Sequence, residues 1–235
     1  MSAAPKCQGQ PYPVAMKRVL EPEVMDSPAE ANAYDAMDHS TVNHDFARRL
    51  LELGATGRVL DIGCGPGHGP LQLVAMASKV SVVGVDLSQY MLTIAEEHKT
   101  VSSHGDRVEF AVADAKKLDY ANGSFDAVCS NTILHHIPNP VEFLREAWRV
   151  RAEGGALLIR DLFRPETSAE VDALVQKHAA HEPQSAQDLL HASLCAALTS
   201  EELVEMARAA GMQGCEVVID SDRHMSLQVA ATKAE

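Results

Sequence analysis

The chain has 235 residues, of which 46% are hydrophobic, and a formal net charge of −13 at pH 7. Its length and apolar content suit one large domain with a sizeable core, and no apolar run reaches the roughly 18 residues that a membrane-spanning helix needs. The negative charge disfavours phosphate backbones and the N-terminus lacks the apolar core of a secretory signal, so we expect a cytoplasmic protein with no nucleic-acid or membrane partner.

The first half of the chain alternates between strand-like and helical patterns. Residues 1–27 are predicted to form an N-terminal arm, poorly ordered or loose over residues 1–18, and residues 28–53 follow a helical pattern. The predicted strands are 58–62, 81–86, 107–112, 125–130 and 156–161, and the helices between them are about 67–77, 88–102 and 140–151. This alternation indicates a parallel sheet covered by helices on both faces.

After residue 161 the alternation ends. A helix-rich insertion without strands, at about 162–198, is predicted to act as a lid that shapes a pocket and excludes water. A capping motif at Thr199 starts a further helix, which Gly211 ends. The runs 215–220 and 224–232 then predict a hairpin. We therefore expect residues 28–235 to form a single domain.

The glycine-rich turn D-I-G-C-G-P-G at residues 61–67 follows one apolar run, and Asp86 ends the next. Glycines let the backbone approach a ligand closely, and the helix after them presents unpaired N–H groups. A carboxylate at the tip of the neighbouring strand can accept hydrogen bonds from both ribose hydroxyls. A dinucleotide fingerprint needs a third glycine where the chain has His68 or Pro70, so a dinucleotide-dependent oxidoreductase is disfavoured.

The turn resembles motif I of the class I S-adenosylmethionine-dependent methyltransferases, including the ubiquinone-biosynthesis type of small-molecule enzyme. Asp114-Ala115 follows the third strand, and the stretch 123–138 is similar to the family's fourth-strand motif, which ends in L-H-H. The resemblance is close over residues 58–162. It implies an α/β fold with a Rossmann-like, seven-stranded, mostly parallel sheet whose last strand is antiparallel, with helices on both faces.

The resemblance also implies how the cofactor S-adenosylmethionine is bound. The glycine turn receives its methionine end, Asp86 its ribose, and Asp114 with the Ala115 N–H its adenine. Cys64 is interpreted as a small residue that fits the turn, and Lys116 as surface charge. The implied cofactor-binding residues are Asp61, Gly63, Cys64, Gly65, Gly67, Asp86, Leu87, Met91, Asp114, Ala115 and Asn131.

Methyl transfer is an in-line displacement at carbon, to which alignment can contribute about 7–11 kcal/mol. Asn131 is not followed by Pro-Pro, and no Pro-Cys pair precedes the fourth strand's end, so two DNA-methylating classes are excluded. We expect a small-molecule acceptor and a monomer or homodimer. A protein side-chain methyltransferase, and a binding module without turnover, stay open as alternatives, as does the methylated atom.

Two sets of residues make opposite predictions about the charge of the acceptor. An acidic stretch with Asp35 and Asp38 favours a cationic amine, whereas Arg160, Arg164 and Arg223 favour a carboxylate. Each histidine of the L-H-H motif is either a catalytic base or a residue that supports the fold and the placement of the cofactor. The candidates near the acceptor are Tyr34, His39, His135, Arg164 and His224.

No metal ligand is assigned from the sequence. The five cysteines are odd in number and include no C-x-x-C pair, which indicates reduced thiols and argues against structural zinc. The histidines of H-x-x-H-E at residues 178–182, with His191 beyond, match neither order of the zinc-protease motif. A polar helix face is the preferred interpretation of this segment.

Overall fold

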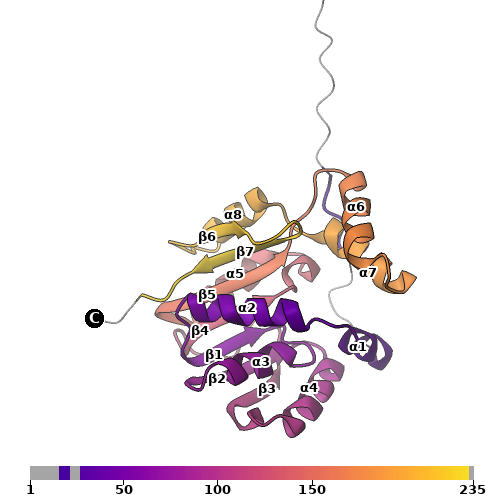
Figure 1. Ribbon diagram of the computed structural model, residues 1–235. Helices are drawn as coiled ribbons and strands as arrows, with labels where there is room; N and C mark the ends of the chain where they lie inside the picture. Colours follow the sequence, from indigo (N-terminus) through magenta and orange to yellow (C-terminus); the bar gives the residue numbers. More distant parts are fainter. Residues whose placement is uncertain (1–15, 22–26, 233–235) are drawn as a thin grey trace, which may run out of the picture.

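The structure is a computed structural model that describes residues 16–21 and 27–232. Its centre is a seven-stranded sheet in the order β3-β2-β1-β4-β5-β7-β6, parallel from β3 to β5, with β7 antiparallel to both of its neighbours (Figure 1). The strands are β1 (Gly57–Ile62), β2 (Val80–Asp86), β3 (Val108–Val112), β4 (Phe125–Asn131), β5 (Arg151–Leu162), β6 (Glu216–Ile219) and β7 (His224–Val229). The predicted fold class is confirmed, including the terminal hairpin.

Eight α-helices and two short 3₁₀ turns accompany the sheet among the described residues. They are α1 (Pro28–Asp35), α2 (Ser40–Glu52), α3 (His68–Met76), α4 (Gln89–Val101), η1 (Gly105–Arg107), η2 (Leu134–His136), α5 (Pro140–Val150), α6 (Ser168–Ala179), α7 (Gln184–Ala196) and α8 (Ser200–Ala209). The sequence pattern treats residues 28–53 as one helical region, but the structure has two helices there. Ser27 caps α1 by accepting the Glu30 N–H, and the Asp38 carboxylate accepts the Ser40 N–H where α2 begins.

The inner strands β1, β2, β4 and β5 are buried on both faces, as their near-continuous apolar runs require, whereas the edge strands β3 and β6 are partly exposed. On β1, Leu60 and Ile62 pack into one cluster with the apolar face of α5 and α8, whereas Val59 packs into the other with α2 and α3. Side chains of a strand alternate between faces, so a single six-residue strand contributes to both clusters. This packing buries β1 between two layers of helices.

The order of the strands reverses at β1, which has β2 on one side and β4 on the other. Ligands of open α/β sheets bind at such a reversal, beyond the carboxyl ends of the strands. Helices α1, α6 and α7 lie together at one end of the sheet (Figure 1). The loops after β1, β2 and β4 therefore meet where these helices gather.

Helices α6 and α7 fall in the predicted insertion and bury a small apolar cluster of their own around Val171 and Leu194. The end of α6 is tied to the β6–β7 turn, because Lys177 Nζ lies 2.7 Å from Asp222 Oδ2 and His178 Nε2 lies 3.0 Å from the same oxygen. His178, one of the histidines considered for metal binding, therefore contacts the Asp222 carboxylate. That the insertion acts as a lid stays a prediction.

The described part of the N-terminal arm, residues 16–21, is docked and not loose. The Met16 N–H donates to Glu166 O at 3.3 Å and the Val19 N–H to Cys195 O at 3.0 Å. The Arg18 side chain donates to the carbonyls of Ala196, His135 and Ile137 at 2.6–3.0 Å. The arm thus joins the insertion to η2. The rest of the predicted arm, residues 1–15 and 22–26, lies outside the described residues.

Among the described helices, none combines the length and the apolar character that crossing a bilayer would need.

Candidate active site

A cavity of about 820 Å³, counted to its open mouth, lies at the ends of β1, β2 and β4. Tyr34 of α1 and His136 of η2 contribute to its wall. The predicted cofactor residues that line it are Gly63, Gly65, Asp86, Leu87, Met91, Asp114, Ala115 and Asn131. One cavity therefore collects residues from four loops that are distant in the sequence.

A smaller hollow shares Tyr34, Gly63, Gly65 and Asn131 with this cavity and continues it past the glycine turn. Its further wall holds two more predicted cofactor residues, Asp61 and Cys64, together with His39 and His68. The two spaces form one elongated site whose larger part lies against β2 and whose smaller part lies against the start of α3.

The glycine turn shapes the wall between the two spaces. Gly65 has φ +52°, and a Cβ atom there would have only the Tyr34 ring, at 3.9 Å, within 4 Å, so its missing side chain leaves room for a ligand. Gly67 lines neither space. It has φ +83°, and a Cβ there would lie 2.7 Å from Phe110 Cζ, so packing against the helix–strand layer requires this glycine.

Asp86 presents an ordered carboxylate to the larger cavity. Its Oδ2 accepts the Gly65 N–H at 2.8 Å and its Oδ1 accepts the Ser88 N–H at 2.9 Å. A carboxylate can accept about four hydrogen bonds, so Asp86 can also accept from a ligand hydroxyl. Burial raises the pKa of Asp86, although the backbone N–H groups of Ser88, Gly65 and Leu87 oppose that shift. The geometry suits a ribose with vicinal hydroxyls.

The far end of the cavity is formed by Asp114, Ala115 and Lys116. Asp114 Oδ1 accepts the Lys116 N–H at 2.9 Å and lies 3.1 Å from Lys116 Nζ. Burial opposes ionisation of Asp114, but these Lys116 contacts outweigh it and lower the pKa of the carboxyl group. Lys116, interpreted from the sequence as surface charge, is part of the cavity wall.

Asp61 is 6% exposed and lies at the smaller hollow. Burial raises the pKa of this carboxyl group to about 7, against the opposing effect of the Cys129 thiol that contacts it. Burial also raises the pKa of Cys64 well above its ordinary value, so this thiol is not a thiolate at neutral pH. The interpretation of Cys64 as a small residue of the turn agrees with this protonation state.

The end of β4 carries a strained residue that the sequence pattern does not reveal. Thr132 has φ +66°, the one positive φ outside glycine among the described residues, and it lines the larger cavity. A β-branched residue in this conformation is a genuine outlier, and such strain gathers at functional sites. Its hydroxyl donates to Asn131 Oδ1 at 3.1 Å, which orients the Asn131 amide beside the cavity.

Two of the predicted acceptor residues, Tyr34 and His39, lie at the elongated site. Burial and the Asp86 carboxylate raise the pKa of Tyr34, so its phenol stays protonated. Burial and the nearby His68 lower the pKa of His39. Its Nε2 is buried without a hydrogen-bond partner among the described residues. A neutral imidazole with an unpaired nitrogen at this position can accept a proton or a ligand hydrogen bond.

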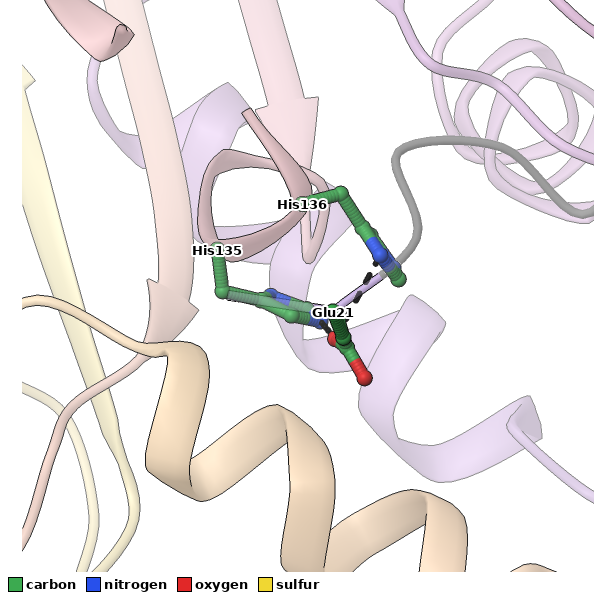
Figure 2. A group of neighbouring side chains, drawn as sticks. All are labelled: Glu21, His135 and His136. Atoms are coloured by element: carbon green, nitrogen blue, oxygen red, sulfur yellow. Dashed lines mark ion pairs between the residues drawn. The ribbon is translucent and has the colours of Figure 1, made fainter. Parts of the chain in front are cut away.

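His135, a third predicted acceptor residue, is buried, and its ring faces Glu21 (Figure 2). Its Nδ1 lies 2.6 Å from Asp161 Oδ1 and its Nε2 lies 3.1 Å from Glu21 Oε1. Burial lowers the pKa of His135, but the two carboxylates outweigh burial and raise it to about 9. Its neighbour His136, not His135, lines the cavity. Glu21 was missed because no sequence pattern connects the arm to this loop.

The remaining predicted acceptor residues, Arg164 and His224, line neither space. His224 lies in a separate cavity with Arg160 and Arg223, and burial with these two cations lowers its pKa to about 3. Arg164 is buried and donates to Met16 O, Ala197 O and Glu202 at 2.6–2.9 Å. These groups hold parts of the fold together in the described structure.

Asp35 and Asp38, considered for a cationic acceptor, also lie outside both spaces. Asp35 Oδ1 lies 2.8 Å from His68 Nε2, and its Oδ2 lies 3.5 Å from His98 Nε2. This contact ties α1 to α3 and α4. Asp38 is exposed and caps the first turn of α2.

Replacing Arg164 by methionine is expected to lower the free energy of unfolding by about 3–5 kcal/mol, because a buried charged donor of three hydrogen bonds is removed and its partners are left unpaired. Urea unfolding followed by circular dichroism measures the change. The exposed Arg208, replaced in the same way, is the control. Equal stability of the two variants would contradict a structural role for Arg164.

The site can now be compared with known proteins. Residues 53–211 match the family model described as a methyltransferase domain. The 27-O-demethylrifamycin SV methyltransferase of Amycolatopsis mediterranei (strain S699) is 36% identical over 124 residues, which cover 53% of this chain and 45% of that protein. Phosphoethanolamine N-methyltransferase 3 of Arabidopsis thaliana is 34% identical over 139 residues, which cover 59% of this chain and 28% of that protein. The matched part is thus less than half of either relative.

Among solved structures, an S-adenosylmethionine-dependent methyltransferase from Aquifex aeolicus superposes with a TM-score of 0.65 at 20% identity. The superposition covers 88% of this chain and 99% of that one. At this identity the likeness shows a shared fold.

Proposed function

Because the chain belongs to the methyltransferase domain family, whose relatives use S-adenosylmethionine, we propose that it transfers a methyl group from this cofactor to a small molecule. The observation that carries the proposal is the elongated site, which joins the buried Asp86 carboxylate to the glycine turn and to Asp61. The part with Asp86 offers a carboxylate for the ribose of the cofactor, and the part with Asp61 offers a buried acid for its methionine end.

The residues present fit the cofactor. The two oxygens of Asp86 have acceptor sites for the ribose hydroxyls, and the open space beside Gly65 admits the ligand close to the backbone. Met91 and the half-exposed Leu87 offer apolar surface for the adenine, and Asp114 offers an acceptor for its amino group. Asp61 is the buried acid at the methionine end, where the cofactor carries an ammonium group.

The cofactor, when bound, supplies a methyl group activated by a positive sulfonium. The chain orients the reactants and encloses them. Helix α1 places Tyr34 over the glycine turn, and η2 closes the cavity with His136 and Ile137. Alignment of this kind contributes most of the catalysis in an in-line displacement. His39, neutral and with an unpaired Nε2, is the group we assign to take a proton where the acceptor must lose one.

A small acceptor is favoured by three considerations. The cavity is a recess bounded by α1, η2 and the loops of the sheet, a shape that suits a small molecule. The net charge of −13 disfavours a nucleic acid. The relatives named above act, by their names, on a rifamycin and on phosphoethanolamine.

An acceptor screen tests the proposal. The full chain is incubated with S-adenosylmethionine and pools of amines, phenols, carboxylates and peptides, and mass spectrometry detects a gain of one methyl group with release of S-adenosylhomocysteine. Methylation of a small molecule is the expected result. Methylation of peptides alone would assign the chain to protein methylation, and cofactor binding without any product would favour the binding-module alternative.

A further inference from the structure

Three side chains beside the cofactor cavity bring potential metal ligands together (Figure 2). His135 and His136 are consecutive on η2, and Glu21 reaches them from the arm. Glu21 Oε1 lies 3.1 Å from His135 Nε2 and 3.3 Å from His136 Nδ1, and all three atoms lie within 4.8 Å of one another. We propose that Glu21, His135 and His136 bind a divalent transition-metal ion of the zinc type, with an open position for a further ligand.

The spacing of the three atoms suits such an ion. Zinc binds nitrogen and carboxylate oxygen at about 2.0–2.2 Å in tetrahedral sites, so two of its ligand atoms lie about 3.3–3.6 Å apart. The two contacts of Glu21 Oε1 are at or just below this range. Two imidazoles and one carboxylate are also the ligand set of zinc sites that keep a fourth position open. A divalent ion therefore needs only a small adjustment of these side chains.

Glu21 Oε1 lacks a partner that would explain its burial. The Glu21 side chain is 7% exposed, and this oxygen has no hydrogen-bond partner of good geometry among the described residues, although two imidazole nitrogens lie 3.1 and 3.3 Å from it. The other oxygen, Oε2, accepts from Ser193 Oγ at 3.4 Å. A buried oxygen without a hydrogen bond costs free energy. A cation between the oxygen and the two rings removes that cost.

The surroundings of His135 support its role as a ligand. Histidines that bind metals donate their other ring N–H to a carboxylate or carbonyl oxygen. Here Nδ1 lies 2.6 Å from Asp161 Oδ1, and Asp161 Oδ2 accepts the His135 backbone N–H at 3.0 Å. Asp161 thereby orients the ring with Nε2 toward Glu21, where the ion would take the place of a proton. Glu21 and Asp161 supply two negative charges against the one positive charge of Arg18, whose guanidinium contacts the His135 carbonyl.

A second group of three potential ligands, Asp35, His68 and His98, lacks these features. Its side chains are 24–40% exposed. Asp35 Oδ1 already has a hydrogen-bonding contact with His68 Nε2 at 2.8 Å, and His98 Nδ1 contacts the Pro66 carbonyl at 2.9 Å. This group links α1 to the sheet layer and provides a matched control for the proposed site.

The open position of the ion is accessible from the cofactor cavity, because His136 and Ile137 belong to the wall of that cavity. An oxygen or nitrogen donor on a small molecule in the cavity is the class of ligand that it would take. The metal site itself does not depend on methyl transfer, and it replaces the sequence-based expectation that no residue binds a metal.

Metal titration of the full chain tests the proposal. After removal of metals with a chelator, Zn²⁺ is titrated by calorimetry and Co²⁺ by its visible absorption. We expect one equivalent bound, with affinity lowered more than 100-fold in Glu21→Gln and in His136→Ala. Asp161→Asn, which changes only the group that orients His135, is expected to lower affinity by roughly 10–100-fold. His98→Ala is expected to bind as the wild type does.

Circular dichroism checks that each variant is folded, and Glu21→Gln is the most conservative because glutamine keeps the size and shape of glutamate. Zn²⁺ should also raise the unfolding temperature of the wild type but not that of Glu21→Gln. No binding by the folded wild type, unchanged binding by Glu21→Gln, or loss of binding in His98→Ala would each overturn the proposal.

Discussion

Asp86→Ala is expected to bind S-adenosylmethionine at least about 100-fold more weakly than the wild type. The carboxylate is the group assigned to the two ribose hydroxyls, and hydrogen bonds to a charged group contribute about 1.5–3 kcal/mol each. Loss of two such bonds costs about 3 kcal/mol or more, which is a factor of 100 or more in the dissociation constant. Isothermal titration calorimetry measures this constant directly.

Two comparisons make the experiment specific. Asp119, an exposed acid outside the cavity, is replaced by alanine as the control and should bind the cofactor normally. Asp86→Asn retains one acceptor oxygen and is expected to fall between the wild type and Asp86→Ala. Unchanged affinity in a folded Asp86→Ala protein would show that another group holds the ribose.

Asp61 is expected to make the ligand-free protein less stable as the pH rises from about 4 to about 7. Its folded-state pKa is about 7, because burial disfavours the charge, whereas an unfolded aspartate has its ordinary pKa of 3.8. Between these values the folded state holds a proton that the unfolded state has released, so the free energy of unfolding falls with rising pH. A difference of about three pKa units corresponds to at most about 4 kcal/mol.

The variant Asp61→Asn isolates this effect from the other titrating groups, among them Asp86 and His39 near the same site. Urea unfolding at pH 4, 6 and 8 gives the stability of both proteins. The variant should gain stability relative to the wild type as the pH rises, with little further gain above pH 8. A stability difference that does not change with pH would contradict the raised pKa of Asp61.

The strands and the cofactor face could be predicted because their signals are local. An apolar run that ends in D-I-G-C-G-P-G, and another that ends in Asp86, occupy consecutive residues, and parallel strands bring their ends together. The break between α1 and α2 was less visible, since residues 28–53 keep a helical composition. It depends on two side-chain caps, at Ser27 and Asp38.

The rest of the site could not be predicted because it depends on distant contacts or on backbone geometry. Glu21 meets His135 only after the arm has crossed the insertion helices. The positive φ of Thr132 follows from how β4 ends against β5, where the Thr132 N–H donates to Arg160 O at 2.8 Å. From the sequence Lys116 is interpreted as surface charge, because only the folded loop brings its Nζ close to Asp114.

The docked arm has a consequence for local unfolding. Arg18 binds carbonyls 117 to 178 positions further along the chain, on η2 and at the end of α7. Segments held by few bonds and little buried apolar surface open with less free energy than the sheet does. Release of residues 16–21 would free η2 and α7 together, so hydrogen exchange at the Val19 amide would report the same opening that uncovers the rear of the cavity.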